Sequence, residues 1–321
     1  MLSPHIGGYI GLENIPLRHF HKTELRFNSA RSALRFLIES RGYKHVYLPL
    51  YICDCFEMLL DRMGISFSFY PVGKDLLPDT HIKTGSGEVM LIVNYFGMLD
   101  NSRIEELKSR HGTIVIDNTQ AFFQPPCENT DTLYTARKFF PVADGAYLFM
   151  SGETAAYTAL PREESTEFSS FLFGRAESSP EAYYDAFRKN EEHLEDPACK
   201  KMSLMSENLL SLFDYDAVLE ARKRNFGILS RLLDGINRLD TSKMKGFFCY
   251  PLLTDKGGEI RQKLIAKRIF IPKLWGCVCD RADSSSFEYE LAENCVMLPV
   301  DQRYGAEEME YMTQCIKDIR I

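Results

Sequence analysis

Residues 113–148, TIVIDNTQAFFQPPCENTDTLYTARKFFPVADGAYL, decide how this chain folds. They begin with a run of buried-strand residues at 114–116 that ends in Asp117. Lys138 follows twenty-one positions later, and Asp144-Gly145 then precedes a second apolar strand. Ligands of open α/β sheets bind outside the carboxyl ends of the strands. We therefore expect the carboxylate and the amine to meet in one binding site.

A carboxylate and an amine at neighbouring strand ends suit one cofactor, pyridoxal phosphate. The amine forms a Schiff base with it, and the carboxylate keeps its pyridinium nitrogen protonated. The spacing alone also allows a simpler interpretation. An Asp that closes a strand is often a turn residue or a helix cap, and a single Lys is usually a solvated surface group.

The composition allows a large core and limits the classes of partner. The chain has 321 residues, 45% of them hydrophobic, and this length predicts one large domain with a smaller one. The formal net charge of −7 favours neither nucleic acid nor an anionic membrane. No apolar run reaches the roughly 18 residues of a spanning helix, and the first residues lack a signal-peptide pattern. We expect a cytoplasmic protein.

Nine cysteines, an odd number in a long chain, predict reduced thiols. Two C-x-C pairs, Cys53/Cys55 and Cys277/Cys279, raise the question of a metal. Their spacing is tighter than the usual zinc pattern, and no His lies beside either pair. We expect buried thiols and no metal site.

Strands and helices alternate in the hydrophobic pattern of the first half. A helix that Asn28 or Ser29 can cap is expected to end at Gly42. Beyond it, the pattern predicts strands at 46–48, 65–70, 89–93 and 114–116, and helices at 53–62 and 101–110. This order calls for an α/β fold with a doubly wound, mostly parallel sheet. Neither a dinucleotide-binding glycine motif nor a P-loop is present.

The second half is predicted to be helical and then to form a small α/β unit. Helical regions span 180–196 and 204–239, the latter interrupted near 213–216. The final unit is predicted to hold strands at 247–253, 271–272 and 296–298 and helices at 259–267 and 306–316. We expect an N-terminal arm (1–25), a large cofactor-binding domain (26–212) and a small C-terminal domain (213–321).

The start of the first predicted helix offers a site for an anion. Ser29, Ala30 and Arg31 bring free backbone N–H groups, a hydroxyl and a guanidinium to a helix N-terminus. Phosphate groups bind readily at such a position. An ordinary amphipathic helix with a Ser cap explains the same residues, so both interpretations stay open.

Four blocks, in order along the chain, are NSARSAL (28–34), VYLPLY (46–51), IDNTQA (116–121) and TARKFFPVADGA (135–146). Together they resemble the DegT/DnrJ/StrS family of sugar aminotransferases, which have the fold-type-I architecture and use pyridoxal phosphate. The first block is similar to a phosphate-binding block and the second to the strand and turn before the cofactor ring. The third resembles the block whose Asp meets the pyridinium nitrogen, and the fourth the block that holds the cofactor lysine.

The resemblance implies roles for individual residues. Lys138 holds the cofactor and moves the proton, and Asp117 binds the ring nitrogen. The other implied contacts with the ring or the phosphate are made by Ser29, Ala30, Arg31, Tyr51, Asn94, Gln120 and Thr135. Our candidates for substrate contacts are Tyr9, Tyr95 and Arg303.

The predicted function is transfer of an amino group from an amino acid, with glutamate as the expected donor, to a keto sugar such as a nucleotide-linked one. The substrates are small molecules, and the resemblance implies a homodimer. The alternative is a non-catalytic relative that keeps the fold for binding or regulation. Its motivation is that Ala30-Arg31 stands where the family usually has Gly-Thr.

Overall fold

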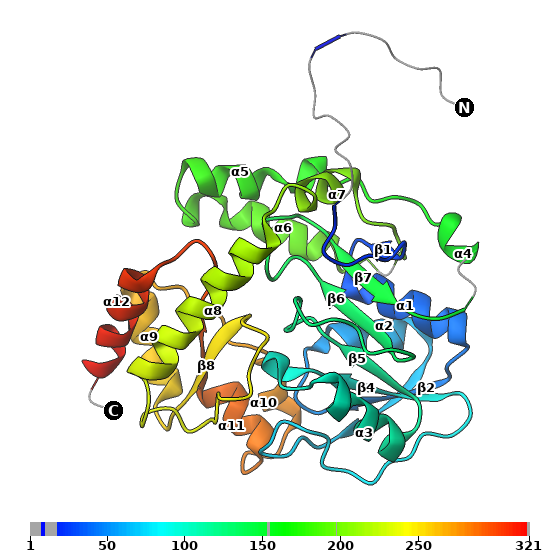
Figure 1. Cartoon of the computed structure of the whole chain (residues 1–321), viewed down its shortest axis with the longest axis horizontal. Coiled ribbons are helices and arrows are strands. Elements are labelled where there is room, and N and C mark those ends of the chain that lie inside the picture. Colours follow the sequence, from blue (N-terminus) through cyan, green and yellow to red (C-terminus); the bar gives the residue numbers. More distant parts are fainter. Residues whose placement is uncertain (1–7, 10–17, 153–154, 197, 320–321) are drawn as a thin grey trace.

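The computed structural model describes residues 8–9, 18–152, 155–196 and 198–319. At its centre lies a seven-stranded sheet in the order β1-β7-β6-β5-β4-β2-β3, with helices packed against it (Figure 1). Five strands are parallel to one another: β2 (His45–Pro49), β3 (Ser66–Tyr70), β4 (Glu88–Val93), β5 (Ile114–Asp117) and β6 (Asp131–Thr135). Two short strands complete one edge: β7 (Ala146–Phe149) runs antiparallel to β6, and β1 (Arg26–Phe27) runs antiparallel to β7. The predicted mostly parallel sheet is confirmed.

The central strands explain why the apolar runs are continuous. Every residue of β5 is buried, as is every residue of β4 after Glu88, which is typical of parallel strands covered on both faces. The register pairs Val93 with Asp117 and Asp117 with Leu133. The carboxyl ends of β4, β5 and β6 therefore lie side by side.

The helices of the first half follow the predicted capping signals. Ser29 caps α1 (Ala30–Arg41), because its Oγ accepts the N–H of Ser32, and Gly42 ends the helix at a left-handed φ of 67°. The helices α2 (Asp54–Met63) and α3 (Asn101–His111) follow at the predicted places.

The middle of the chain is helical in the two predicted regions, and it also holds helices between residues 155 and 177 that were not predicted. It contains α4 (Ala155–Thr158), η2 (Thr166–Phe168), α5 (Ser170–Glu177), η3 (Glu181–Tyr183), α6 (Tyr184–His193), α7 (Leu204–Leu210) and α8 (Tyr215–Leu232). The helix α5 was missed because Gly174 is its one buried residue, so it leaves no periodic apolar stripe in the sequence.

The last part of the chain forms a second, two-stranded antiparallel sheet of β8 (Cys249–Leu253) and β9 (Cys295–Pro299). Its helices are α9 (Gly257–Ala266), α10 (Val278–Arg281), α11 (Phe287–Asn294) and α12 (Ala306–Lys317). The strand predicted at 271–272 is wrong, because the second sheet of the described chain consists of β8 and β9 alone and these residues pair with neither. Among the described residues, no helix combines the length and the apolar character needed to cross a membrane.

Candidate active site

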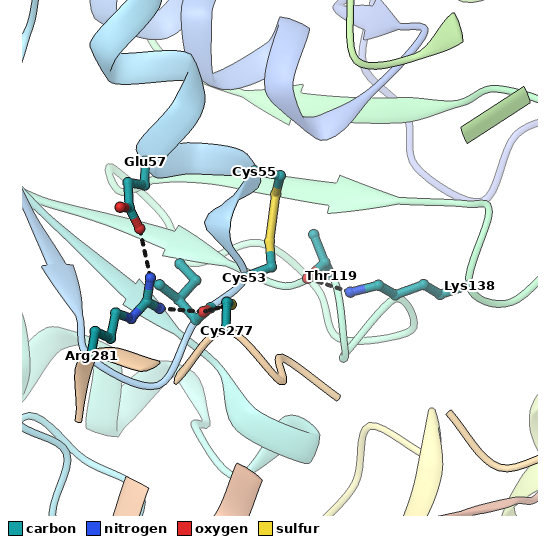
Figure 2. The surroundings of a disulfide bond; sticks show 8 residues. Cys53, Cys55, Glu57, Thr119, Lys138, Cys277 and Arg281 are labelled. Carbon is teal, nitrogen blue, oxygen red and sulfur yellow. Dashed lines mark hydrogen bonds and ion pairs between the residues drawn. A yellow bond between two sulfur atoms is a disulfide. The ribbon is translucent and has the colours of Figure 1, made fainter. Parts of the chain in front are cut away.

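Asp117 and Lys138 meet at a third residue, Thr119. Lys138 Nζ donates to Thr119 Oγ1 at 3.3 Å, and the N–H of Thr119 donates to Asp117 Oδ1 at 2.8 Å. Figure 2 shows the lysine side chain extended toward Thr119. Asp117 is 4% exposed at the end of β5. The carboxylate and the amine thus converge on one turn.

Burial and mutual attraction set the charges of this pair. Burial raises the pKa of Asp117, while the Lys138 charge and the Thr119 hydrogen bonds oppose that rise. Burial lowers the pKa of Lys138, and the Asp117 carboxylate opposes that change. The amine is therefore easier to deprotonate than a solvent-exposed lysine, which suits proton transfer near neutral pH.

The lysine stands on a tight turn. The carbonyl oxygen of Ala136 accepts the N–H groups of both Phe139 and Phe140 at 2.9 Å. The N–H of Ala136 donates to Gly145 O at 3.0 Å, which fastens the turn to the segment before β7. The backbone that carries Lys138 is therefore fixed on its N-terminal side.

Gln120 places a free donor beside this turn. Its side chain is fully buried, and its Oε1 accepts the N–H of Phe96 at 2.9 Å. Its Nε2 has no hydrogen-bond partner among the described residues. An unpaired buried donor costs about 1–3 kcal/mol, so an acceptor atom of a bound ligand would stabilise it.

Asn94, at the end of β4, is instead fully used within the protein. Its Nδ2 donates to Asn118 Oδ1 at 2.9 Å and to Gln124 Oε1 at 2.8 Å. Its Oδ1 accepts the N–H of Leu99 at 2.8 Å. The amide stabilises the turn after β4, and its predicted contact with the cofactor ring stays a prediction.

Two glycines let the chain before β8 approach Gln120. The N–H of Gly246 donates to Phe96 O at 2.7 Å. A Cβ on Gly246 would lie 2.2 Å from Gln120 O, and one on Gly97 would lie 2.3 Å from Gly246 N. This close contact places the Phe248 ring with its centroid 5.4 Å from Lys138 Nζ.

The start of α1 adjoins the lysine turn through Gly145. The N–H of Gly145 donates to Asn28 O at 2.8 Å, and Gly145 O accepts the Thr135 hydroxyl at 3.3 Å. Ser29 and Ala30 therefore begin their helix next to Thr135. The first N–H groups of a helix have no intrahelical partner. Ser29 Oγ accepts that of Ser32, which leaves those of Ala30 and Arg31 for an anion.

Two arginines add positive charge near that helix start. The Nε atoms of Arg31 and Arg137 are buried and have no hydrogen-bond partner among the described residues. Burial lowers the pKa of both guanidinium groups, that of Arg137 to about 10, and the charge of Arg31 contributes to the shift at Arg137. Glu191 pairs with Arg137, but a further anion would relieve the repulsion between the two cations.

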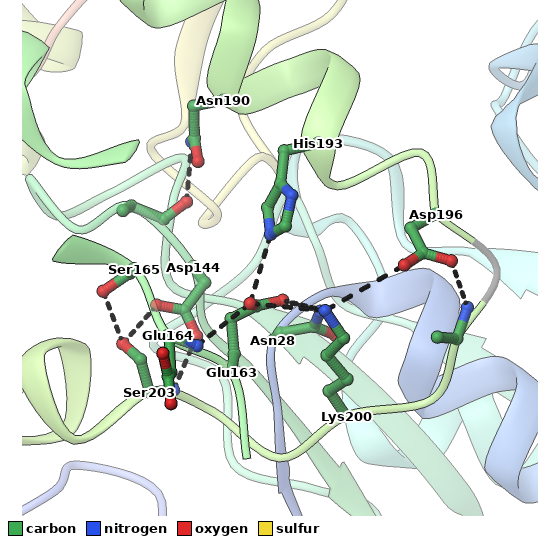
Figure 3. A network of polar contacts seen from close by, with 12 residues as sticks. Asn28, Asp144, Glu163, Glu164, Ser165, Asn190, His193, Asp196, Lys200 and Ser203 are labelled. Atoms are coloured by element: carbon green, nitrogen blue, oxygen red, sulfur yellow. Dashed lines mark hydrogen bonds and ion pairs between the residues drawn. The ribbon is translucent and has the colours of Figure 1, made fainter. Parts of the chain in front are cut away.

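A network of buried carboxylates anchors the backbone on either side of this region (Figure 3). Asp144 Oδ1 accepts the hydroxyls of Ser203 at 2.6 Å and Ser206 at 2.5 Å. Glu163 Oε2 accepts the amide of Asn28 at 2.8 Å. Asn28 precedes the cap of α1 and Asp144 precedes Gly145, so the helix start is preorganised before any ligand binds.

Tyr51 and Tyr95 belong to a packed aromatic group. The ring centroid of Tyr51 lies 4.7 Å from that of Trp275 and 5.6 Å from that of Tyr95. The hydroxyl of Tyr95 donates to Tyr51 O at 2.5 Å. Both tyrosines are buried. Their predicted contacts with the cofactor and the substrate stay predictions.

Tyr9 and Arg303 lie outside this group of residues. Tyr9 is 97% exposed, so its side chain is open to solvent. Arg303 Nε pairs with Asp301 Oδ1 at 2.7 Å, and its guanidinium lies 5.2 Å from the Tyr304 ring. No contact in the described chain joins Arg303 to Lys138 or Asp117.

Cys53 and Cys55 are joined in a disulfide at the start of α2 (Figure 2). This contradicts the expectation of reduced thiols throughout. The turn that opens α2 brings the two Cα atoms within 5.4 Å, a distance that a disulfide spans. The other seven cysteines are free.

The residues that we missed come mainly from distant parts of the chain. Thr119 could have been predicted from the sequence, because it stands two residues after Asp117 in the block that we singled out. The ring of Phe248 contacts Lys138 itself. Arg222 and Gln302 donate to Phe139 O in the lysine turn, from 83 and 163 positions away in the sequence. No local pattern marks such contacts.

No protein-family model and no curated protein matches the sequence. Solved structures match it in fold. A DegT DnrJ EryC1 StrS aminotransferase from Brucella abortus has a TM-score of 0.66 at 15% identity, with 92% of this chain and 85% of that one covered.

Two further matches have similar scores. Spr1654 from Streptococcus pneumoniae, in its PLP form, has a TM-score of 0.65 at 16% identity, with 92% of this chain and 86% of that one covered. DesI, in the presence of its TDP-sugar product, has a TM-score of 0.64 at 13% identity, with 91% and 79% covered. The fold is that of fold-type-I aminotransferases, and the predicted fold class is confirmed.

Proposed function

We propose that the protein is a PLP-dependent aminotransferase that moves an amino group from an amino acid, with glutamate as the expected donor, to a keto sugar. The observation that carries this proposal is the meeting of Lys138 and Asp117 at Thr119, on a turn that adjoins the N-terminus of α1. The fold supports it, because the matching structures include aminotransferases.

The residues present fit the cofactor. Lys138 supplies the amine and Asp117 the carboxylate, while Gln120 offers an unpaired donor. The first turn of α1, from Ser29 to Arg31, would receive the phosphate. When bound, pyridoxal phosphate supplies an electron sink for the substrate's carbanion.

The chain's own contribution is binding and proton transfer. Asp117 would hold the ring nitrogen in its protonated form. Because burial lowers the pKa of Lys138, its Nζ would serve as the group that takes up and releases the substrate's proton near neutral pH.

A nucleotide-linked keto sugar is our proposed acceptor. The support comes from the fold match with DesI, whose structure was determined in the presence of its TDP-sugar product. Tyr9, Tyr95 and Arg303 remain the candidate substrate contacts.

We further propose a cytoplasmic homodimer with a domain boundary near residue 213. Exposed apolar side chains support self-association, and they include Phe173 of α5 at 55%, Leu204 of α7 at 54% and Leu212, which follows α7, at 61%. Light scattering during size-exclusion chromatography would give the mass, and a monomer at all concentrations would contradict the dimer.

An absorbance titration tests the function. Wild-type protein mixed with pyridoxal phosphate should gain the band of a lysine-bound cofactor, and glutamate should convert it to that of the pyridoxamine form. Lys138→Ala should not gain the band, while Lys223→Ala, on the exposed face of α8, should behave as wild type. A band that glutamate does not change would favour the non-catalytic alternative.

A further inference from the structure

Arg222, on α8, is a fully buried cation with no carboxylate partner for its hydrogen bonds. It is 2% exposed, and all its hydrogen bonds within the described chain go to uncharged oxygens. Burial lowers its pKa to about 10. Asp301, whose charge acts on it, is already bound to Arg303. Burying a guanidinium without a carboxylate partner costs desolvation free energy. The contacts that it makes therefore call for a functional explanation.

Those contacts join three separate segments around Lys138. Arg222 Nη2 donates to Phe139 O at 3.1 Å, directly after the lysine. Its Nη1 donates to Phe247 O at 3.1 Å and Phe248 O at 3.3 Å, and its Nε donates to Gln302 Oε1 at 2.9 Å. Gln302 Nε2 in turn donates to Phe139 O at 2.8 Å.

One side chain therefore fixes the backbone of two segments that lie beside the Lys138 amine. Ala136 fixes the lysine turn on its N-terminal side, and Arg222 fixes it on its C-terminal side at Phe139. The same guanidinium holds the backbone of Phe248, whose ring faces Lys138 Nζ. The planar guanidinium carries five N–H donors and can reach acceptors that are spread in this way. A lysine carries its three donors on one nitrogen and cannot replace it.

We propose that Arg222 is a positioning residue that aims the Lys138 amine at Thr119 and Asp117 by clamping Phe139 and Phe248. This inference rests on the proposed function, because it assigns Lys138 the reacting amine. A displacement of about 1 Å can slow a positioned reaction by on the order of a hundredfold. Arg222 acts through the lysine and touches neither cofactor nor substrate.

The test compares Arg222→Lys with Lys223→Met. The first keeps the charge and loses the fork, and the second removes an exposed charge from the next position of the same helix, where it pairs with Glu220. In Arg222→Lys we expect kcat, and the rate at which Lys138 takes up pyridoxal phosphate, to fall about ten- to hundredfold. The KM for the amino donor should stay unchanged, and Lys223→Met should match wild type.

A second readout separates positioning from simple loss of stability. Water that enters around a loosened lysine should raise the pKa of its amine, so the pH profile of cofactor uptake should move to higher pH in Arg222→Lys. Gln302→Leu removes one clamp from Phe139 O and should shift the profile in the same direction by less. Arg222→Lys with the wild-type rate and profile would overturn the proposal, as would an equal loss in Lys223→Met.

The proposal can fail independently of the proposed function. If wild type takes up no pyridoxal phosphate, the function fails. The role of Arg222 is then tested in the cofactor-free protein. The measured quantity is the rate at which trinitrobenzenesulfonate labels Lys138, as a function of pH. An identical labelling profile in wild type, Arg222→Lys and Gln302→Leu, with all three folded by circular dichroism, would overturn it.

Discussion

Lys138 Nζ lies 3.3 Å from Thr119 Oγ1, and Thr119 is the residue whose N–H binds Asp117. One short turn after β5 therefore receives both charges of the candidate site. The arrangement explains why the two residues can be far apart in sequence and still act together, since β5 and β6 are adjacent and parallel. It also means that each charge affects the ionisation of the other.

The first prediction concerns Asp117→Asn. The Asp117 carboxylate raises the pKa of Lys138 against the effect of burial, so its removal should lower that pKa further. The pH profile of cofactor uptake should move to lower pH. Amino transfer should meanwhile fall about tenfold to hundredfold, because a charge-assisted hydrogen bond of about 1.5–3 kcal/mol is lost. Stopped-flow absorbance across pH measures both, and a shift to higher pH would contradict the assignment.

The second prediction separates the cap of α1 from its role in binding phosphate. Ser29→Ala should destabilise the protein by about 1 kcal/mol, because Ser32 N–H loses its acceptor. Ser29→Asp should keep the cap and complement the helix dipole, yet its negative charge should repel a phosphate. Urea unfolding and fluorescence titration with pyridoxal phosphate measure the two effects. Tight binding by Ser29→Asp would place the phosphate elsewhere.

The third prediction concerns the approach of Gly246 to Gln120. A methyl group there would lie 2.2 Å from Gln120 O, so Gly246→Ala should cost about 1–3 kcal/mol through overpacking. Gly227→Ala is the matched control, because Gly227 lies within α8 and a methyl group added there would meet no described atom within 4 Å outside its own helix. That change should stabilise the helix by about 0.5–1 kcal/mol. Equal stabilities in urea would show that the chain at Gly246 can relax.

Much of the fold could be read from the sequence, because it depends on local patterns. The continuous apolar runs of β4 and β5 predicted buried parallel strands, and Ser29 and Gly42 marked both ends of α1. The strand predicted at 271–272 fails for a non-local reason. The second sheet has two strands, and an apolar pair of residues does not show whether a partner strand exists.

The candidate site was predictable where chemistry and chain order coincide. Asp117 and Lys138 stood out because each closes or follows a strand at the same sheet edge. Arg222 stands in the sequence among Glu220, Lys223 and Arg224, a charged run that is typical of a solvated helix face. Its burial depends on the backbone oxygens of Phe139 and Phe247, which present no side-chain signal at all.

The last prediction concerns the disulfide between Cys53 and Cys55. Denatured protein should show seven reactive thiols without reductant and nine after reduction, because seven cysteines are free. A loop of three residues restricts the unfolded chain little, so reduction should lower the unfolding free energy by only about 1–2 kcal/mol. Cys53→Ser should show the same loss and no further effect of reductant. Nine reactive thiols before reduction would restore the original expectation of free thiols.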